Sequence, residues 1–122
     1  MKLFIKRVAL LILGLLILLS VACTPKLESK LNETNTLIAK RAITAVDKYL
    51  DGDPDWKAAK DAVDRERNKI DEDDEKIHWF SLSSDLLIIS TTFTGFYTKG
   101  EDVAKVRGLR NDIAELAGIL KR

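Results

Sequence analysis

The segment from Trp79 to Tyr97 (WFSLSSDLLIISTTFTGFY) decides between an all-helical and a mixed fold. Its Leu86–Ile89 and Thr91–Phe93 runs have the β-branched and aromatic composition that is typical of strands. Its apolar residues nevertheless follow one another at steps of three and four, as on one face of a helix: Trp79, Leu82, Leu86, Ile89, Phe93 and Phe96. Because hydrophobic period is the stronger signal, we predict a helix over 82–98 and an all-α protein.

The residues before this segment predict another helix, over 54–77. Asp53-Pro54 suits a helix start, since proline is well placed in a first turn. The apolar stripe of this helix is narrow: Trp56, Ala59, Val63, Ile70 and Ile77. No glycine or proline separates it from the next helix, so the two could be continuous. At 100° per residue, however, the apolar direction turns by more than about 90° between Ile77 and Leu82. This favours a break near Ser81–Asp85.

Two further helices are expected at the ends of the chain. The first covers 25–50, with Thr24-Pro25 as N-cap and first helical residue. The polar run Asn32–Thr36 leaves open a later start, near Asn35 or Thr36. The last helix covers 100–121 and is opened by Thr98–Glu101, which reads as a capping box. Short connections favour antiparallel neighbours, so we predict a small antiparallel four-helix bundle with the 82–98 helix as its most buried member.

The N-terminus carries the pattern of an export signal. Basic Lys2, Lys6 and Arg7 precede an unbroken apolar run from Val8 to Leu19, and small residues lead to Cys23. From Val8 to Cys23 there are 16 residues, fewer than the roughly 20 that a spanning helix needs. The length and flanks suit a cleaved signal peptide, and Lys2, Lys6 and Arg7 are expected to stay in the cytoplasm.

Residues 1–23 resemble a bacterial lipoprotein signal, whose lipobox ends in a small residue followed by cysteine. Leu19, Ala22 and Cys23 match this pattern, whereas Ser20 departs from the usual leucine. The resemblance implies cleavage between Ala22 and Cys23, a diacylglyceryl group on the thiol and an acylated (palmitate-type) amine. Residues 1–22 would be the signal peptide, and 23–122 a single lipid-anchored domain. In Gram-negative bacteria, Thr24 in place of aspartate would favour the periplasmic face of the outer membrane.

The mature chain gives no indication of nucleic-acid binding. Without residues 1–22 it has 100 residues, with 17 Lys and Arg against 19 Asp and Glu, a net charge of −2. The charge is uneven, because Asp51 to Glu75 holds 11 acidic and 5 basic residues. We interpret this segment as solvated helix surface, since a nucleic-acid interface would be basic.

The motifs that resemble catalytic or metal sites are incomplete. Asp51, Asp53 and Asp55 alternate like calcium ligands, but the glycine and glutamate that such a loop requires are missing, so turn and cap roles are expected. The acidic run Asp71–Glu75 has no His or Cys at metal-site spacing. His78 is the only histidine and has no partner constellation in the sequence. We therefore predict no catalytic residue, metal or cofactor, and a protein that is not an enzyme.

The aromatic residues are expected mainly in the core: Trp56, Trp79, Phe80, Phe93, Phe96 and Tyr97. If Phe96, Tyr97 and Lys99 lie at an exposed helix end, they would instead contact lipid headgroups or a partner. The expected function is a non-enzymatic protein-interaction module, anchored to the cell envelope through Cys23. The alternative is a carrier of a small ligand or lipid, with a cavity inside the bundle beside the apolar run Leu86–Ile89.

Overall fold

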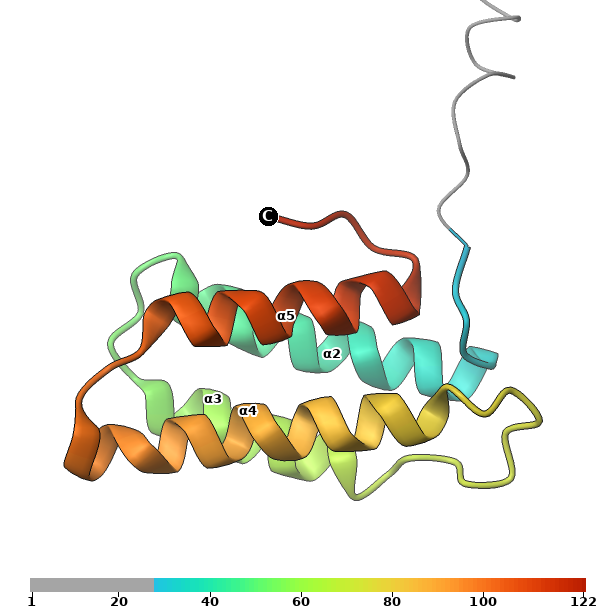
Figure 1. Ribbon diagram of the computed structural model, residues 1–122, viewed down its shortest axis with the longest axis horizontal. Helices are drawn as coiled ribbons and strands as arrows, with labels where there is room; N and C mark the ends of the chain where they lie inside the picture. The colour runs from blue at the N-terminus through green and yellow to red at the C-terminus, as the bar shows by residue number, and fades with distance from the viewer. Residues whose placement is uncertain (1–27) are drawn as a thin grey trace, which may run out of the picture.

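The computed structural model describes residues 28–122, which form an all-α four-helix bundle, as the sequence predicts. Its helices are α2 (Glu33–Leu50), α3 (Trp56–Arg67), α4 (Trp79–Lys99) and α5 (Val103–Ala117). Each helix runs antiparallel to the one before it (Figure 1). The helix predicted from the period of residues 79–97 is therefore present, and no strand occurs between residues 28 and 122.

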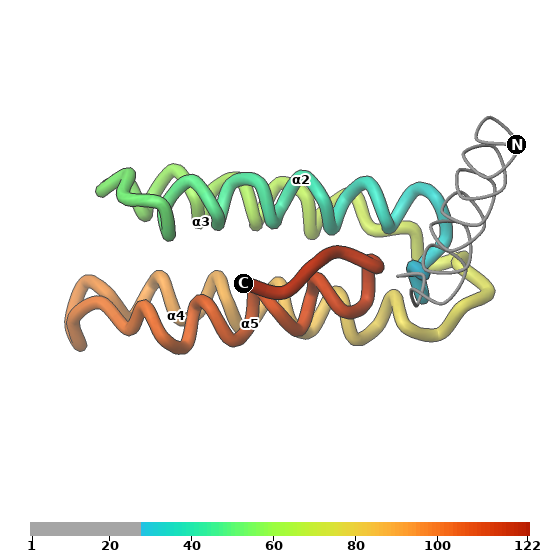
Figure 2. Tube along the Cα trace, turned by 90° about the horizontal axis from the view of Figure 1, so that it is seen from above, coloured from blue at the N-terminus to red at the C-terminus, as the bar shows by residue number. Residues whose placement is uncertain are grey.

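The helices form two layers, α2 beside α3 and α4 beside α5 (Figure 2). Helices that are adjacent in sequence pack together, and α2 also packs along α5 and closes the bundle. Every helix therefore has one side toward the common core, so an amphipathic stripe on each is sufficient to build the fold.

The core is formed by apolar side chains from all four helices. At its centre lie α4 residues Leu82, Leu86, Ile89 and Phe93, all fully buried. Near the end where α4 finishes, the rings of Tyr49, Trp56, Phe93 and Phe96 pack mainly edge to face, with centroids 5.3–6.0 Å apart. Such aromatic pairs add packing energy beyond the apolar area that they bury.

The boundary between the second and third predicted helices lies earlier than Ser81–Asp85. Helix α3 ends at Arg67 rather than at residue 77, and α4 begins at Trp79 rather than at residue 82. The side-chain amide of Asn35 explains the early end of α3. It accepts from the backbone N–H of Asp71 and donates to the Asp71 carbonyl, both at 2.9 Å. These bonds hold the backbone in a loop, and the repulsion among the carboxylates of 71–75 further disfavours a helix there.

The first helix begins later than residue 25. Residues 28–32 are not helical, and the Asn32 side chain caps α2 by accepting from the Asn35 N–H at 2.8 Å. The later start near Asn35 or Thr36 is therefore closer to the observed one. The non-helical segment packs on the end of α5, where the Lys30 N–H donates to the Leu116 carbonyl at 2.8 Å. Leu31 is buried beside this contact.

The last helix is shorter than predicted at both ends. Thr98 and Lys99 belong to α4, and Asp102, not Thr98, caps α5 by accepting from the Lys105 N–H at 3.1 Å. Helix α5 ends at Ala117 because Gly118 takes the left-handed conformation, with φ +69°. A Cβ atom at Gly118 would lie 2.7 Å from the Glu28 carbonyl carbon, so the docked N-terminal segment also requires glycine there.

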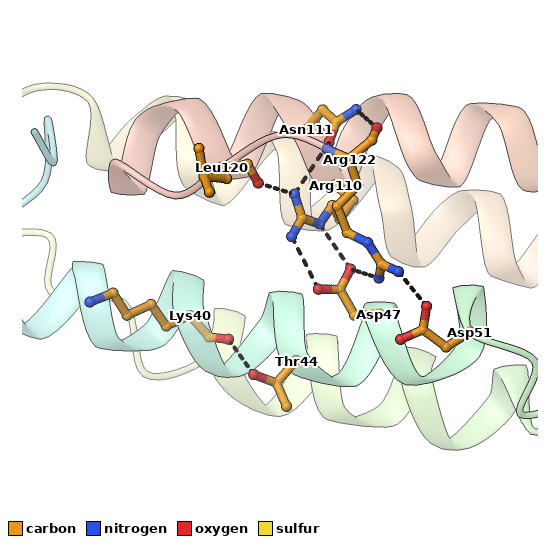
Figure 3. A network of polar contacts seen from close by, with 8 residues as sticks. All are labelled: Lys40, Thr44, Asp47, Asp51, Arg110, Asn111, Leu120 and Arg122. Atoms are coloured by element: carbon orange, nitrogen blue, oxygen red, sulfur yellow. Dashed lines mark hydrogen bonds and ion pairs between the residues drawn. The ribbon is translucent and has the colours of Figure 1, made fainter. Parts of the chain in front are cut away.

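Residues 119–122 fold back along the bundle and are held by a polar network (Figure 3). Arg110 binds both carboxylate oxygens of Asp47, at 2.8 and 3.1 Å, and donates to the Leu120 carbonyl at 2.6 Å. Arg122 pairs with Asp47 at 3.2 Å and with Asp51. The tail therefore joins α2 to α5 across the outside of the bundle, in place of the predicted last turn of helix.

Candidate interaction surface

The most distinctive surface of the described chain is the outer side of α4, which has no charge. We define the α4 face as the residues of this helix that point away from the bundle: Phe80, Ser84, Leu87, Ile88, Thr91, Thr94, Gly95 and Thr98. Phe80 is 66% exposed, Leu87 46% and Ile88 43%. The only charged residues of α4 are Asp85 and Lys99. From residue 80 to residue 98, about 27 Å of helix at 1.5 Å per residue, this face presents only apolar, hydroxyl and glycine surface.

Three threonine hydroxyl groups of α4 are bonded within the helix itself. Thr91, Thr92 and Thr94 donate to the carbonyls four residues earlier, at 2.8, 2.8 and 3.1 Å. A hydroxyl bonded in this way has less need of solvent, and the threonine methyl groups remain available for contact. The α4 face can therefore be covered by another surface at little cost in lost hydrogen bonds.

The exposed sides of the other three helices are charged. In each case several of the exposed residues carry a full charge: Glu33, Lys40, Arg41 and Lys48 on α2, Lys57, Asp61 and Arg65 on α3, and Lys105, Arg107, Asp112 and Glu115 on α5. These sides have the composition of ordinary solvated helix surface. Helix α4 is therefore the one helix of residues 28–122 whose outer side lacks the charged residues usual on a solvent-facing surface, and such an apolar surface is typical of an interaction site.

A shallow groove of about 360 Å³ runs along one edge of the α4 face. Leu87, Ile88 and Gly95 of α4 line it on one side, and Asp102 and Lys105 at the start of α5 on the other. Gly95 has only the side chain of Lys99 within 4 Å of where a Cβ would lie, so the groove is open above it. The carrier hypothesis placed Leu87 and Ile88 beside an internal cavity, whereas both lie on the outside.

The aromatic residues divide between the core and the surface. Phe93 and Phe96 are buried, as predicted, and Trp56 is half-buried. Phe80 is wrongly predicted as core, since it is 66% exposed; Tyr97 is 62% exposed, which agrees with the alternative position at an exposed helix end rather than with the core. Tyr97 packs its ring on Trp56 with centroids 4.6 Å apart, and the Lys57 ammonium lies 5.1 Å from the Tyr97 ring centre.

The other residues that the sequence singled out have structural roles or lie outside the described residues. Cys23, the Ala22–Cys23 cleavage position and Thr24-Pro25 belong to residues 1–27, which the structure does not describe. His78 precedes α4, is exposed, and makes no side-chain cap hydrogen bond. Asp74 is buried and accepts from the Asn32 N–H, the Asn35 amide and the Lys76 N–H at 2.9–3.0 Å.

The electrostatics of Asp74 follow from this position. Burial alone would raise its pKa, but the three donors and the Lys76 charge outweigh burial and hold the pKa of Asp74 below its ordinary value. The carboxylate therefore stays ionised to lower pH than usual and stabilises the loop before α4. It is bonded to the protein on both oxygens, so it is not free to act as an acid or base beside His78.

The alternating aspartates after α2 act as turn and cap residues, as expected. Asp53 accepts from the Asp55 N–H at 2.9 Å, Asp55 caps α3 by accepting from the Ala58 N–H at 3.0 Å, and Asp51 pairs with Arg122. Between residues 28 and 122, no group of three or more His, Cys, Asp or Glu side chains is arranged to hold a metal ion.

Comparisons of the chain with protein-family models, with curated proteins and with solved structures give no match. A function for this chain is therefore inferred from the surface chemistry and the geometry of its described residues. Across residues 28–122, no helix has both the length and the apolar content that crossing a membrane demands.

This surface has only a weak signal in the amino-acid sequence. Leu87 and Ile88 lie more than 100° around the helix from the direction of Leu82, at about 100° per residue. Their position, together with the lack of charge on that side, identifies a second apolar face. The tail network of Asp47, Arg110 and Arg122 has no comparable local signal, because Asp47 lies 63 residues before Arg110.

Asp85, at the edge of α4 toward α5, is expected to make stability depend on pH. Burial and the nearby charge of Asp112 raise the pKa of Asp85 to about 6, so ionisation near neutral pH disfavours the folded state. We expect Asp85→Asn to raise the free energy of unfolding at pH 7 by about 1 to 2 kcal/mol, allowing for partial exposure.

The wild type should also gain stability relative to this variant as the pH falls from 7 to 5. Urea titrations of both proteins over that range measure the difference. If the difference in free energy of unfolding between the two proteins stays constant with pH, Asp85 does not titrate in the folded state over that range.

Proposed function

We propose that this protein is a non-enzymatic lipoprotein of the bacterial cell envelope, anchored by acyl chains on Cys23, that binds another envelope protein through the α4 face. The observation that carries the binding proposal is the uncharged outer side of α4, from Phe80 to Thr98, on a bundle whose other helices are charged outside. The anchor proposal rests on the lipobox-like sequence that ends at Cys23.

The chemistry of the α4 face favours a helical partner with an uncharged face. An interface core is depleted in charged residues and enriched in apolar ones, and Leu87 and Ile88 supply such groups. Small residues such as Ser84 and Gly95 leave space between these larger side chains. A single helix laid along this side would contact i, i+3, i+4 and i+7 positions in turn, the usual pattern of helix-in-groove recognition.

Replacement of Leu87 by lysine is expected to abolish partner capture. Leu87 lies near the middle of the α4 face, and an interface would have to desolvate the new ammonium group. We expect at least a tenfold loss of the captured protein in an affinity pull-down from mildly extracted native envelopes, quantified by mass spectrometry. Because Leu87 is exposed, folding stability should change by less than about 0.5 kcal/mol.

Leu37→Lys is the matched control for this experiment. Leu37 is a leucine of equal exposure, 47% against 46%, on the charged outer side of α2. The Leu37→Lys variant should capture the same protein as the wild type. Equal loss in both variants, or no specific capture by the wild type, would contradict the proposed binding surface.

The anchor is tested separately by Cys23→Ser. The wild type should carry the mass of the acyl groups on a chain that begins at Cys23, and should resist extraction from membranes by salt and carbonate. The variant should lack this mass and become extractable, since stable anchoring requires two or more acyl chains. A wild type without acyl mass that washes off as readily as the variant would show that the lipoprotein assignment is wrong.

A further inference from the structure

Two apolar side chains stand out into solvent at the end of the bundle where α4 begins. Ile77 is 79% exposed and Phe80 66%. The Phe80 N–H donates to the Ile77 carbonyl at 3.2 Å, so the two residues belong to one turn. Residues three apart in such a turn lie on the same side, and together they make a small apolar projection.

This projection lies at the end of the bundle where the N-terminal segment arrives. The Lys76 ammonium donates to the Leu31 carbonyl at 3.4 Å, and the Asn32 N–H donates to Asp74 at 2.9 Å. Both views show the start of α2 and the loop before α4 at one end of the molecule (Figures 1 and 2). The two apolar side chains are therefore close to where the chain continues toward Cys23.

The length of chain outside the described part limits how far this end can be from a membrane. Glu28 is five residues after Cys23, and a fully extended chain spans at most about 3.3–3.6 Å per residue, or roughly 17 Å in all. The polar layer of a bilayer is itself several Å deep. An acylated Cys23 would hold the Ile77 end of the bundle within reach of the lipid headgroups.

We propose that Ile77 and Phe80 insert into the phospholipid surface, so that the bundle stands on this end with its helices directed away from the membrane. This inference rests on the proposed acylation of Cys23. Phe80 is the end of the α4 face nearest this tether, so Ile77 and Phe80 contact the bilayer, and the partner protein contacts the face from Ser84 onward. The tether brings this end, and not the opposite one, to the lipid. The acidic run Asp71–Glu75 beside it favours zwitterionic over anionic headgroups.

This orientation also defines the proposed partner more closely. Helix α4 runs along the long axis of the bundle (Figure 1). In an upright bundle its outer side therefore faces sideways, along a line that rises from the membrane surface. A partner helix could then lie along it only if that helix also rises from the membrane. We therefore expect the protein bound by the α4 face to present a helix close to the bilayer.

The two tryptophans lie at opposite ends of the bundle and report the orientation. Trp79 is the first residue of α4 and packs on Phe80, with ring centroids 5.8 Å apart. Trp56 packs on Phe96 and Tyr97 at the other end of α4, about 26 Å away along the helix at 1.5 Å per residue. Trp56→Phe and Trp79→Phe each leave one reporter, and both variants are to be made in the full acylated protein.

The experiment compares tryptophan quenching by lipid in these two proteins. Each is reconstituted into phosphatidylcholine vesicles with and without acyl-chain bromination, after intact mass spectrometry. We expect bromination to quench Trp79 at least twofold more than Trp56. Ile77→Ser with Phe80→Ser should remove most of that difference, whereas Val103→Ser, an exposed apolar position at the far end of the bundle, should leave it unchanged.

The outcomes separate this inference from the proposed anchor. Acyl mass on Cys23 with equal quenching of both tryptophans, or with no quenching, would overturn the upright insertion and leave the anchor standing. Greater quenching of Trp56 would overturn it as well, as would an unchanged difference in the serine double variant. A chain without acyl mass would overturn the anchor and the insertion together.

Discussion

Replacing Asp47 by alanine is expected to lower the free energy of unfolding by about 3 kcal/mol, the lower end of the cost of leaving a buried charge unpaired, because Asp47 itself is 23% exposed. Arg110 is only 4% exposed and binds both oxygens of Asp47 (Figure 3). Without the carboxylate, its charge is buried with only the Leu120 carbonyl and the Asn111 side chain as acceptors. Urea denaturation followed by circular dichroism measures the loss.

Asp51→Ala is the matched control for this prediction. Asp51 lies four residues after Asp47 and pairs with Arg122, but both members of this pair are exposed to solvent. We expect a loss below about 1 kcal/mol, as for most surface ion pairs. The double variant Asp47→Leu with Arg110→Met should recover most of the stability, because it removes the buried charge together with its partner. Similar losses for Asp47→Ala and Asp51→Ala would refute the role assigned to burial.

Asn35→Ala is expected to cost about 3 kcal/mol, since roughly 1 kcal/mol is lost for each buried hydrogen bond and more for one to a charged group. Asn35 is fully buried, and its amide makes three such bonds, two to the Asp71 backbone and one to the Asp74 carboxylate. Chemical denaturation gives the total loss. Measured by hydrogen exchange, the amide exchange rates should increase most in the loop between α3 and α4.

The pH dependence of this variant is a further consequence. The Asn35 amide is one of the donors that lower the pKa of Asp74, so part of the wild-type stability is lost as the pH falls through that lowered pKa. The variant should lose less on acidification because it has less of this stabilisation to lose. Asn68→Ala, an exposed amide at the end of α3, is the control and should change stability by less than about 0.5 kcal/mol. A comparable loss at Asn68 would argue against a specific role for Asn35.

The number and type of the helices could be predicted from sequence because their apolar stripes are local. The step pattern of Trp79 to Phe96 indicates a helix in spite of strand-forming residues, and α4 spans those positions. The end of α3 could not be predicted in this way. It depends on the side-chain amide of Asn35, 36 residues away, which hydrogen-bonds the Asp71 backbone. No sequence pattern between Arg67 and His78 predicts that contact.

The end of α5 shows the same limit. Its apolar stripe continues through Leu120, yet the helix ends at Ala117, because the next residue, Gly118, is left-handed and lies against the backbone of Glu28 and Ser29. For the candidate site, the sequence indicates an anchor at Cys23 but not a binding surface. Hydrophobicity alone does not say whether Leu87 and Ile88 lie inside or outside, and the packing of α4 on α3 and α5 determines that they are outside.

The measurement that tests the central claim most directly is site-specific photo-crosslinking in intact cells. A photoreactive amino acid is placed at Leu87 on the α4 face, and at Leu37 on α2 as a control of equal exposure. We predict that Leu87 crosslinks to one envelope protein and that Leu37 does not. The same crosslinks from both positions, or none from Leu87 in a protein that is folded and acylated, would contradict a partner-binding role for the α4 face.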